Sequence, residues 1–349
     1  MEKKKVGIVG FGGMGRHHYR WYKNSDVVEL AGIYDIKQSA VDYAESENIH
    51  AYASLAELLA DDAIEIVLVA TPNDVHIPIA IEAMKAGKHV ISEKPVTVSS
   101  EELKVAFEAS EKYGRLFTVH QNRRFDADFL AVKNLYQSNE IGDIFCIESR
   151  VHGSRGIPGD WRKEKAHGGG MMLDWGVHLI DQMMQMIDSP IDTIYCVCDH
   201  ITNKEVDDGF KMDTLFENGL RFRIEVSTSN FISLPRWYVL GRGGSAKIDT
   251  FKSDVNIVTC SQMIEENVAP VVTAAGLTKT MAPRSEKTIT ERTVPKPPSD
   301  VHDYYRNFCA AIDGKATQLV THEQMMQVMR IMETAFESDR LGRPVKFEG

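Results

Sequence analysis

The sequence predicts an α/β fold in which a doubly wound parallel sheet is followed by an antiparallel sheet. At 349 residues, the chain exceeds the length that a single hydrophobic core usually serves. Residues 4–121 alternate short β-branched runs with amphipathic helical stretches, which is typical of a parallel sheet. Beyond residue 122, longer strands alternate apolar with polar residues, as in an antiparallel sheet with one wet face. We therefore predict a first domain over residues 1–121 and a second over residues 122–349.

Composition and charge exclude several classes of protein. Apolar residues make up 43% and charged residues 26%, as in ordinary soluble proteins, and the apolar runs are too short to span a membrane. A net charge of -10 without a basic block argues against nucleic acid as a partner. The cysteines are odd in number and lack zinc-site spacing, so we expect buried thiols in the cytoplasm: Cys146, Cys196, Cys198, Cys260 and Cys309.

The first domain is predicted to contain six strands and several helices. The strands are expected at residues 5–9, 28–34, 51–53, 64–70, 89–92 and 116–120. Helices are expected over residues 54–60, with Ser54 as the N-cap, and over residues 99–113, closing at Gly114.

The second domain is predicted to be mostly β. Its strands are expected at residues 145–152, 193–199, 211–217, 220–227, 237–241 and 246–250, with a hairpin turn at Glu217-Asn218-Gly219. A Met-rich helix is expected over residues 172–187, and two more over residues 301–312 and 322–341. Residues 263–300 are polar and end in a Pro-rich stretch, so we predict a long excursion over the surface.

A dinucleotide site is predicted after the first strand. A G-x-G-x-x-G motif stands between a predicted strand and a helix, where glycines let the backbone approach a pyrophosphate: Gly10, Phe11, Gly12, Gly13, Met14 and Gly15. Alone, this motif also fits a ligand-free turn. Asp35, which ends the second strand, adds a carboxylate for the ribose hydroxyls and favours NAD over NADP, although nearby Lys37 weakens that exclusion.

Chemistry-bearing residues gather where two strands end and where one helix begins. Thr71-Pro72-Asn73 and Glu93-Lys94-Pro95 follow neighbouring strands and therefore emerge at the carboxyl edge of the sheet, where ligands bind. Three glycines at 168–170 precede Asp174 and His178, which share one helix face. The carboxylate can orient the imidazole, or both can point at one substrate. A metal site would need a third ligand that this stretch does not offer, so we expect no metal ion.

Taken together, these motifs resemble the glucose-fructose oxidoreductase and inositol 2-dehydrogenase family. The resemblance spans nearly the whole chain, from the Gly10 motif through Trp161-Arg162 to Gly342-Arg343-Pro344-Val345. It implies a Rossmann domain followed by an α/β domain with a large, mostly antiparallel open sheet. The outer face of that sheet commonly builds homodimers or homotetramers.

The resemblance also implies roles for individual residues. Lys94, Asp174 and His178 match the family's catalytic residues, and Pro95 matches a proline that often follows a cis peptide bond. Positions expected to line the cofactor are Thr71, Pro72, Asn73, His76, Glu93, Lys94, Gln121, Trp161 and Arg162. Positions expected to face the substrate by the same resemblance are Lys94, Arg124, Trp161, Asp174 and His178. The stretch with His152, Arg155, Asp160 and Trp161 is also expected to face it, because hydrogen-bonding groups beside an aromatic face suit a polyhydroxylated ring.

The implied reaction is NAD-dependent oxidation of a sugar or cyclic polyol hydroxyl. In this hypothesis His178 accepts the hydroxyl proton, Lys94 polarises the oxygen, and a hydride passes to the nicotinamide. Two alternatives stay open: transient oxidation of a glycoside at C3 that leads to elimination or cleavage, and a sugar sensor without catalysis. Arg155 and Lys163 also suit a carboxylate or phosphate, so a sugar acid stays among the candidate substrates.

Overall fold

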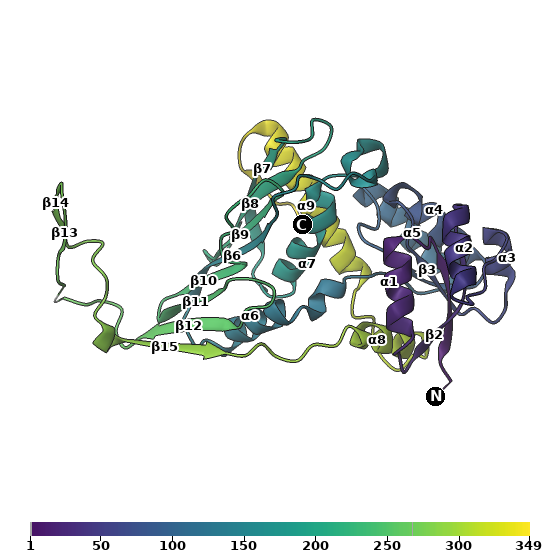
Figure 1. Ribbon diagram of the computed structural model, residues 1–349, viewed down its shortest axis with the longest axis horizontal. Coiled ribbons are helices and arrows are strands. Elements are labelled where there is room, and N and C mark those ends of the chain that lie inside the picture. Colours follow the sequence, from purple (N-terminus) through teal and green to yellow (C-terminus); the bar gives the residue numbers. More distant parts are fainter. Residues whose placement is uncertain (1, 267) are drawn as a thin grey trace.

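The computed structural model describes residues 2–266 and 268–349. Two lobes lie side by side, with the parallel sheet at one end and the antiparallel sheet at the other (Figure 1). Helices α7 (Val177–Met184) and α9 (His322–Leu341) lie between them. Within the described residues, no helix is long and apolar enough to cross a membrane.

The first lobe holds a five-stranded parallel sheet in the order β2-β1-β3-β4-β5. Its strands are β1 (Lys4–Val9), β2 (Val28–Tyr34), β3 (Ile66–Val69), β4 (His89–Ser92) and β5 (Phe117–Val119). The predicted strand at residues 51–53 is wrong. It is reduced to a single bridge between Ile33 and Ala51, because the chain turns into a helix directly afterwards.

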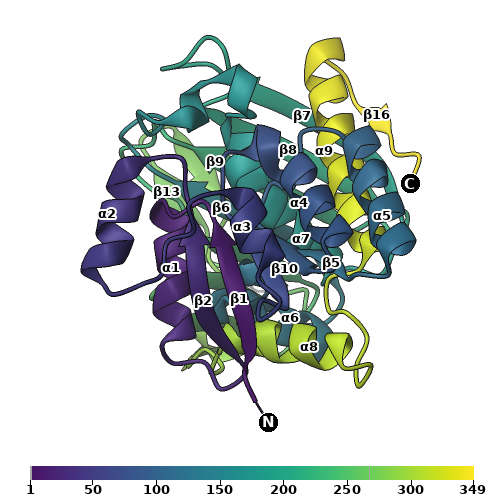
Figure 2. The same cartoon turned by 90° about the vertical axis from the view of Figure 1, so that its right-hand side faces the viewer.

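Helices flank this sheet as the alternating pattern predicts. They are α1 (Gly13–Tyr22), α2 (Gln38–Ser46), α3 (Leu55–Ala60), α4 (His76–Lys85) and α5 (Ser100–Tyr113). The predicted caps are confirmed: Ser54 accepts the Glu57 N–H, and Gly114 ends α5 in the left-handed region at φ 59°. Helix α5 contacts both α4 and α9, and Figure 2 shows the three helices close together.

The second lobe is a nine-stranded sheet in the order β15-β12-β11-β10-β6-β9-β8-β7-β16. Among the described strands of this sheet, only the β6–β9 pair is parallel, so the predicted mostly antiparallel sheet is confirmed. The bounds are β6 (Ile144–His152), β7 (Ile191–Asp199), β8 (Gly209–Phe216), β9 (Arg221–Ser227), β10 (Trp237–Gly241), β11 (Gly244–Ile248), β12 (Val255–Cys260), β15 (Ile289–Val294) and β16 (Val345–Lys346).

Residues 263–300 form more than a surface excursion, so that prediction is wrong in part. The β15 segment is an edge strand paired with β12. Its residues are mainly exposed and polar, so they lack the apolar alternation from which a strand is predicted. Strands β13 (Val271–Thr273) and β14 (Gly276–Thr278) form a separate hairpin that projects far beyond the sheet (Figure 1).

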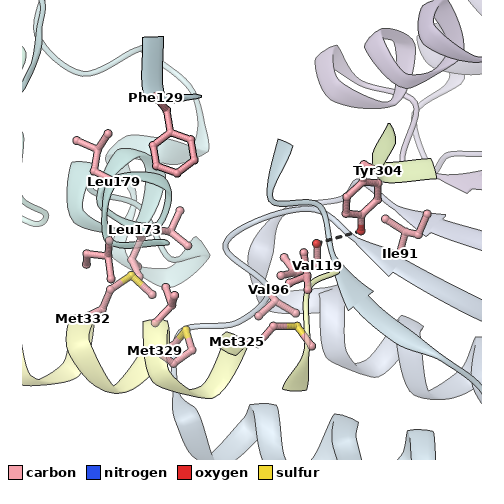
Figure 3. Close-up of a cluster of buried hydrophobic side chains, with 14 of the residues drawn as sticks. Ile91, Val96, Val119, Phe129, Leu173, Leu179, Tyr304, Met325, Met329 and Met332 are labelled. Carbon is pink, nitrogen blue, oxygen red and sulfur yellow. Dashed lines mark hydrogen bonds between the residues drawn. The ribbon is translucent and has the colours of Figure 1, made fainter. Parts of the chain in front are cut away.

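Methionines of α9 pack between the two lobes, as their helical spacing predicts. Met325 lies near Val96 and Val119, whereas Met329 and Met332 lie near Leu173 (Figure 3). All three methionines are buried. Flexible thioethers fill such irregular gaps well, so this cluster packs the helices against the first lobe.

Two further helices complete the second part of the chain. Helix α6 (Ala127–Ser138) precedes the large sheet, and α8 (His302–Ile312) returns to the first lobe. The Tyr304 hydroxyl of α8 donates to the Val119 carbonyl at 3.0 Å, as drawn in Figure 3. This late segment therefore helps to hold β5, and the domain boundary at residues 121 and 122 stays a prediction.

Candidate active site

The glycine loop after β1 is tight on one side and open on the other. Gly10 has φ +91°, and a Cβ there would lie 2.6 Å from the Ala70 carbonyl oxygen. A Cβ at Gly15 would lie 2.2 Å from the Gly10 oxygen. At Gly12 and Gly13, by contrast, a Cβ would meet no described atom within 4 Å. Open space therefore stands over the N-terminus of α1, where free N–H groups attract phosphate.

Asp35 stands beside this loop at the end of β2. Its Oδ2 accepts the Phe11 N–H at 2.6 Å and its Oδ1 accepts the Lys37 N–H at 2.8 Å. These bonds fix the direction of the carboxylate, and each oxygen keeps a lone pair for a further donor. Phe11 itself is buried, so it contributes backbone and packing, while Met14 is half-buried.

The carboxyl edge of the sheet carries buried polar atoms without partners. Thr71 Oγ1 and Gln121 Oε1 have no hydrogen-bond partner within the described part of the chain. Asn73, also buried, donates from Nδ2 to the Gly168 carbonyl at 3.0 Å and so ties this edge to the glycine run before Asp174. Pro72 is exposed. Buried atoms left unpaired at a ligand-binding edge are typical of a site completed by a ligand.

His76 does not face this edge as a free ligand-binding group, contrary to the sequence prediction. Its Nε2 lies 2.8 Å from the Thr71 carbonyl oxygen and its Nδ1 lies 3.0 Å from the Pro95 carbonyl oxygen. Burial lowers the pKa of the ring despite those two carbonyls. His76 therefore joins the segments that follow β3 and β4. The predicted cis peptide bond before Pro95 is confirmed.

The Glu93 carboxylate, predicted to line the cofactor, is held in a buried cluster of histidines and a tyrosine. Its Oε1 lies 2.7 Å from His18 Nε2 and 3.0 Å from His120 Nδ1, and Tyr305 of α8 lies 2.6 Å from His18 Nδ1. Burial raises the pKa of Glu93, but hydrogen bonds from the two imidazoles outweigh burial and hold it well below its usual value. The sequence prediction missed both histidines, although His18 follows the glycine motif and His120 directly precedes Gln121, because nothing in the sequence connects the two segments.

The same cluster is the one group among the described residues that offers three close donor atoms to a metal ion. The candidate ligand atoms of His18, Glu93 and His120 lie within 4.8 Å of one another. Direct hydrogen bonds already satisfy the shared carboxylate oxygen without a cation. The prediction that the chain binds no metal is left untested.

The Asp174 carboxylate contacts both Lys94 and Arg162. Lys94 Nζ lies 2.9 Å from Asp174 Oδ1 and 3.0 Å from the Asp174 carbonyl oxygen. Arg162 Nε lies 3.2 Å from Asp174 Oδ2. Burial alone would raise the pKa of the Asp174 carboxyl, but the two cations outweigh burial and lower it. The structure thus brings two of the three predicted catalytic residues into contact and adds Arg162.

The helix that carries Asp174 and His178 differs from the prediction. It opens with a π-helical segment, Met172–Gly176, and continues as α7. Both Asp174 carboxylate oxygens face cations, so the carboxylate is already engaged rather than directed at the imidazole. π-Helical turns are frequent at functional sites because they shift side chains out of ordinary helical register.

His178 is buried and lies within reach of the charges of two cations. Burial, together with the charges of Lys94 and Arg123, holds the pKa of its imidazole well below the usual value. Its Nδ1 has no hydrogen-bond partner among the described residues. The sequence prediction missed Arg123, whose guanidinium lies 4.1 Å from the Trp175 ring centroid. A neutral imidazole with a free nitrogen is equipped to accept a proton.

Arg124 was expected to face the substrate, but it lies elsewhere. Its guanidinium is paired with both Asp181 carboxylate oxygens, at 2.6 and 2.8 Å, and also donates to the Leu319 carbonyl. The residue is only 6% exposed. A buried, fully bonded guanidinium of this kind fixes α7 against the chain that leads into α9.

The remaining predicted substrate residues are distributed around the end of β6. His152 Nδ1 accepts the Leu234 N–H at 3.3 Å, and its Nε2 lies 3.6 Å from Glu225 Oε1. Asp160 pairs with Arg162 at 2.8 Å, and the Arg162 guanidinium lies 4.6 Å from the Trp161 ring centroid. Asp160 and Trp161 therefore support Arg162. Arg155 lines a separate cavity of about 440 Å³.

Comparison with known proteins agrees with this architecture. Residues 4–121 match the model of the oxidoreductase family with an NAD-binding Rossmann fold, and residues 129–247 match the GFO/IDH/MocA C-terminal domain. A solved NAD-binding protein from Listeria innocua is 41% identical, with a TM-score of 0.95 over 99% of this chain and 100% of that chain.

Two curated relatives from Bacillus subtilis have named activities. The scyllo-inositol 2-dehydrogenase (NADP(+)) IolW is 29% identical over 99% of this chain and 96% of its own length. A glucose-6-phosphate 3-dehydrogenase is 30% identical over 54% of this chain and 55% of its own length. With both family models matched in order, this chain belongs to the GFO/IDH/MocA family of NAD(P)-binding oxidoreductases, dehydrogenases that act on CH–OH donors.

Proposed function

We propose that the protein oxidises a hydroxyl of a sugar, sugar derivative or cyclic polyol and uses NAD as the hydride acceptor. One observation carries the proposal. The His178 imidazole, whose Nδ1 has no partner among the described residues, is neutral and feels the charge of Lys94, which Asp174 anchors after β4 of the sheet that carries the glycine-rich loop. Proton acceptor, oxygen-polarising cation and dinucleotide loop are the parts that such a reaction requires.

The residues present fit a dinucleotide. The open face over Gly12 and Gly13 suits a pyrophosphate, and the unpaired Thr71 Oγ1 and Gln121 Oε1 suit the polar edge of the nicotinamide half. Asp35 suits the ribose hydroxyls and would repel a 2′-phosphate, so NAD is favoured although the relative IolW is named for NADP. When bound, the cofactor supplies the hydride acceptor.

Lys94 would polarise the substrate oxygen. Its ammonium has three N–H donors, of which one serves Asp174 Oδ1 and one serves the Asp174 carbonyl. The third is left for the hydroxyl oxygen that becomes a carbonyl. Asp174 keeps the ammonium in place and balances its charge, and Arg162 holds the other carboxylate oxygen.

His178 would take the hydroxyl proton. Because burial and neighbouring cations disfavour the imidazolium, the ring is neutral and ready to accept at neutral pH. The proton moves from the substrate O–H to a ring nitrogen as the C–H bond gives up its hydride. Dry packing of α7 around the ring, which is 4% exposed, keeps competing water from that nitrogen.

We also propose a cytoplasmic homodimer or homotetramer. The five free cysteines suit a reducing compartment. On the large sheet, Tyr195 and Val197 of β7 are exposed between buried neighbours, and Phe145 and Leu215 are exposed on nearby strands. Exposed apolar side chains among ion pairs such as Asp213–Arg223 suit an interface between copies, which combines apolar contacts with polar ones.

A spectrophotometric panel tests the proposed reaction. Purified protein is mixed with NAD or NADP and with inositols, aldoses, sugar acids or glucosides, and NADH formation is followed by absorbance. Substrate-dependent NADH formation, faster with NAD than with NADP, is the expected result. If the protein binds NAD tightly and converts a glucoside, but forms NADH with no compound, the proposal is wrong and transient C3 oxidation takes its place.

A further inference from the structure

A cavity beside the proposed catalytic group has the composition of an anion site. It encloses about 440 Å³ where β6 and β9 end. Its wall combines two cations with hydroxyl, amide and apolar groups: Arg155, Lys163, Ser154, Thr202, Asn203, Thr228, Ser229, Ile157, Ile201 and Phe231.

Several of its polar groups have no partner inside the protein. Neither Arg155 nor Lys163 makes a side-chain hydrogen bond or ion pair with residues 2–266 or 268–349. Ser229 Oγ is buried, and it has no hydrogen-bond partner in those ranges either. In a chain of net charge -10, two unpaired cations facing one cavity create a local attraction for an anion.

The cavity is adjacent to the proposed catalytic group through the chain itself. Lys163 follows Arg162, whose Nε lies 3.2 Å from Asp174 Oδ2. The Lys163 carbonyl accepts from Asn203 Nδ2 at 3.2 Å, which fixes this turn against the cavity wall. Consecutive Cα atoms are about 3.8 Å apart, so the backbone of the cavity wall continues directly into the residue that holds Asp174.

The cavity wall also has an apolar part, which selects among anions. Ile157 is half-buried, whereas Phe231 is 89% exposed and stands at the rim. Apolar and aromatic surfaces suit the C–H faces of a carbohydrate ring, and inorganic ions gain nothing from them. The combination therefore fits an organic anion better than a free ion.

We propose that this cavity binds an anionic substituent, a phosphate or a carboxylate, of the polyhydroxylated substrate. Arg155 and Lys163 pair with the anionic oxygens, and the Ser229 hydroxyl donates a hydrogen bond. The inference rests on the proposed dehydrogenase function and narrows its substrate class to sugar or polyol phosphates and sugar acids. It assigns Arg155 and Lys163 to specificity rather than to the chemical step.

Calorimetric titration tests the inference directly. The NAD-bound, full-length protein is titrated with glucose 6-phosphate, inositol 1-phosphate and glucuronate, each beside its uncharged parent. We expect at least one anion to bind about tenfold or more tightly than its parent, and Arg155→Gln and Lys163→Gln each to remove most of that preference. Lys165→Gln, in the neighbouring exposed turn, is the control and should keep the preference.

The two proposals fail in different ways. Equal binding of anions and parents, or a preference that survives in both variants, would overturn the anion site even if NADH forms. Tight anion binding that depends on Arg155, but without NADH formation, would support the anion site and count against the dehydrogenase. With an accepted anionic substrate, Arg155→Gln is expected to raise KM about tenfold and to leave kcat within about twofold. The anion that gains most over its uncharged parent, a phosphate or glucuronate, identifies the substituent as a phosphate or a carboxylate.

Discussion

Replacing Asp174 by Asn tests whether the carboxylate anchors the lysine that polarises the substrate. The substitution keeps the shape of the side chain but leaves Lys94 and Arg162 without a shared counter-charge. Because both Lys94 and Asp174 side chains are only 13% exposed, we expect a loss of about 2 kcal/mol in the free energy of unfolding. Misplacement of the ammonium should lower kcat/KM about 100-fold, equivalent to about 2.7 kcal/mol of transition-state stabilisation.

Asp160 provides the matched control for that experiment. It pairs with the same Arg162, at 2.8 Å, but its side chain is 47% exposed. Asp160→Asn should therefore cost about 0.5 kcal/mol or less and change kcat/KM less than about threefold. Urea unfolding and initial rates are measured for both variants. Equal effects of the two substitutions, or an Asp174→Asn enzyme with kcat/KM within about twofold of the parent, would refute the anchoring role.

Four other predictions follow from the same geometry. His178→Ala should lower kcat about 1,000-fold and change the NAD dissociation constant less than about threefold, by calorimetry; equal losses would contradict a base role. Asp35→Asn should raise kcat/KM for NADP relative to NAD about tenfold, and an unchanged ratio would contradict the ribose contact. Burial, followed by the charge of His120, lowers the pKa of His18 to about 4. Between pH 6.5 and 4 only the unfolded state binds this proton, so the free energy of unfolding should fall by about 3 kcal/mol as the pH is lowered through that range. His18→Gln should flatten that slope in urea unfolding. Tyr195→Glu should dissociate the oligomer in light scattering, and an unchanged mass would exclude this face.

Local sequence signals predicted the parts of the fold that depend on local physics. Helix caps at Ser54 and Gly114 and the hairpin at Asn218-Gly219 are set by hydrogen bonds within a few residues, and they stand where the pattern predicts. The parallel and antiparallel sheets follow from hydrophobic alternation. Edge strand β15 was not predicted because an edge strand needs little apolar surface. At Ala51, residues typical of a strand form only one bridge, so no strand is made there.

Site residues divide in a similar way. Lys94 and Asp174 were predicted from motifs, and the structure brings them into contact. Glu93 and Arg124 looked like ligand contacts in the sequence, yet each is bound by residues that no local pattern connects to it. Such pairings depend on how distant segments pack, so a single sequence carries no signal for them. For the same reason, only the folded chain could show that His178 Nδ1 has no partner among the residues that the structure describes.

Isotope transfer is the most direct test of the central claim that the enzyme moves a hydride from a carbinol carbon to NAD. A polyol or sugar accepted in the panel is deuterated at its reacting carbon, and the reduced cofactor is analysed by mass spectrometry and NMR. The account predicts a single deuterium at the nicotinamide C4 position. The rate at which labelled NADH forms should fall in Lys94→Met and in His178→Ala as much as turnover falls. Unlabelled NADH, or deuterium that returns to the sugar without net reduction, would contradict it.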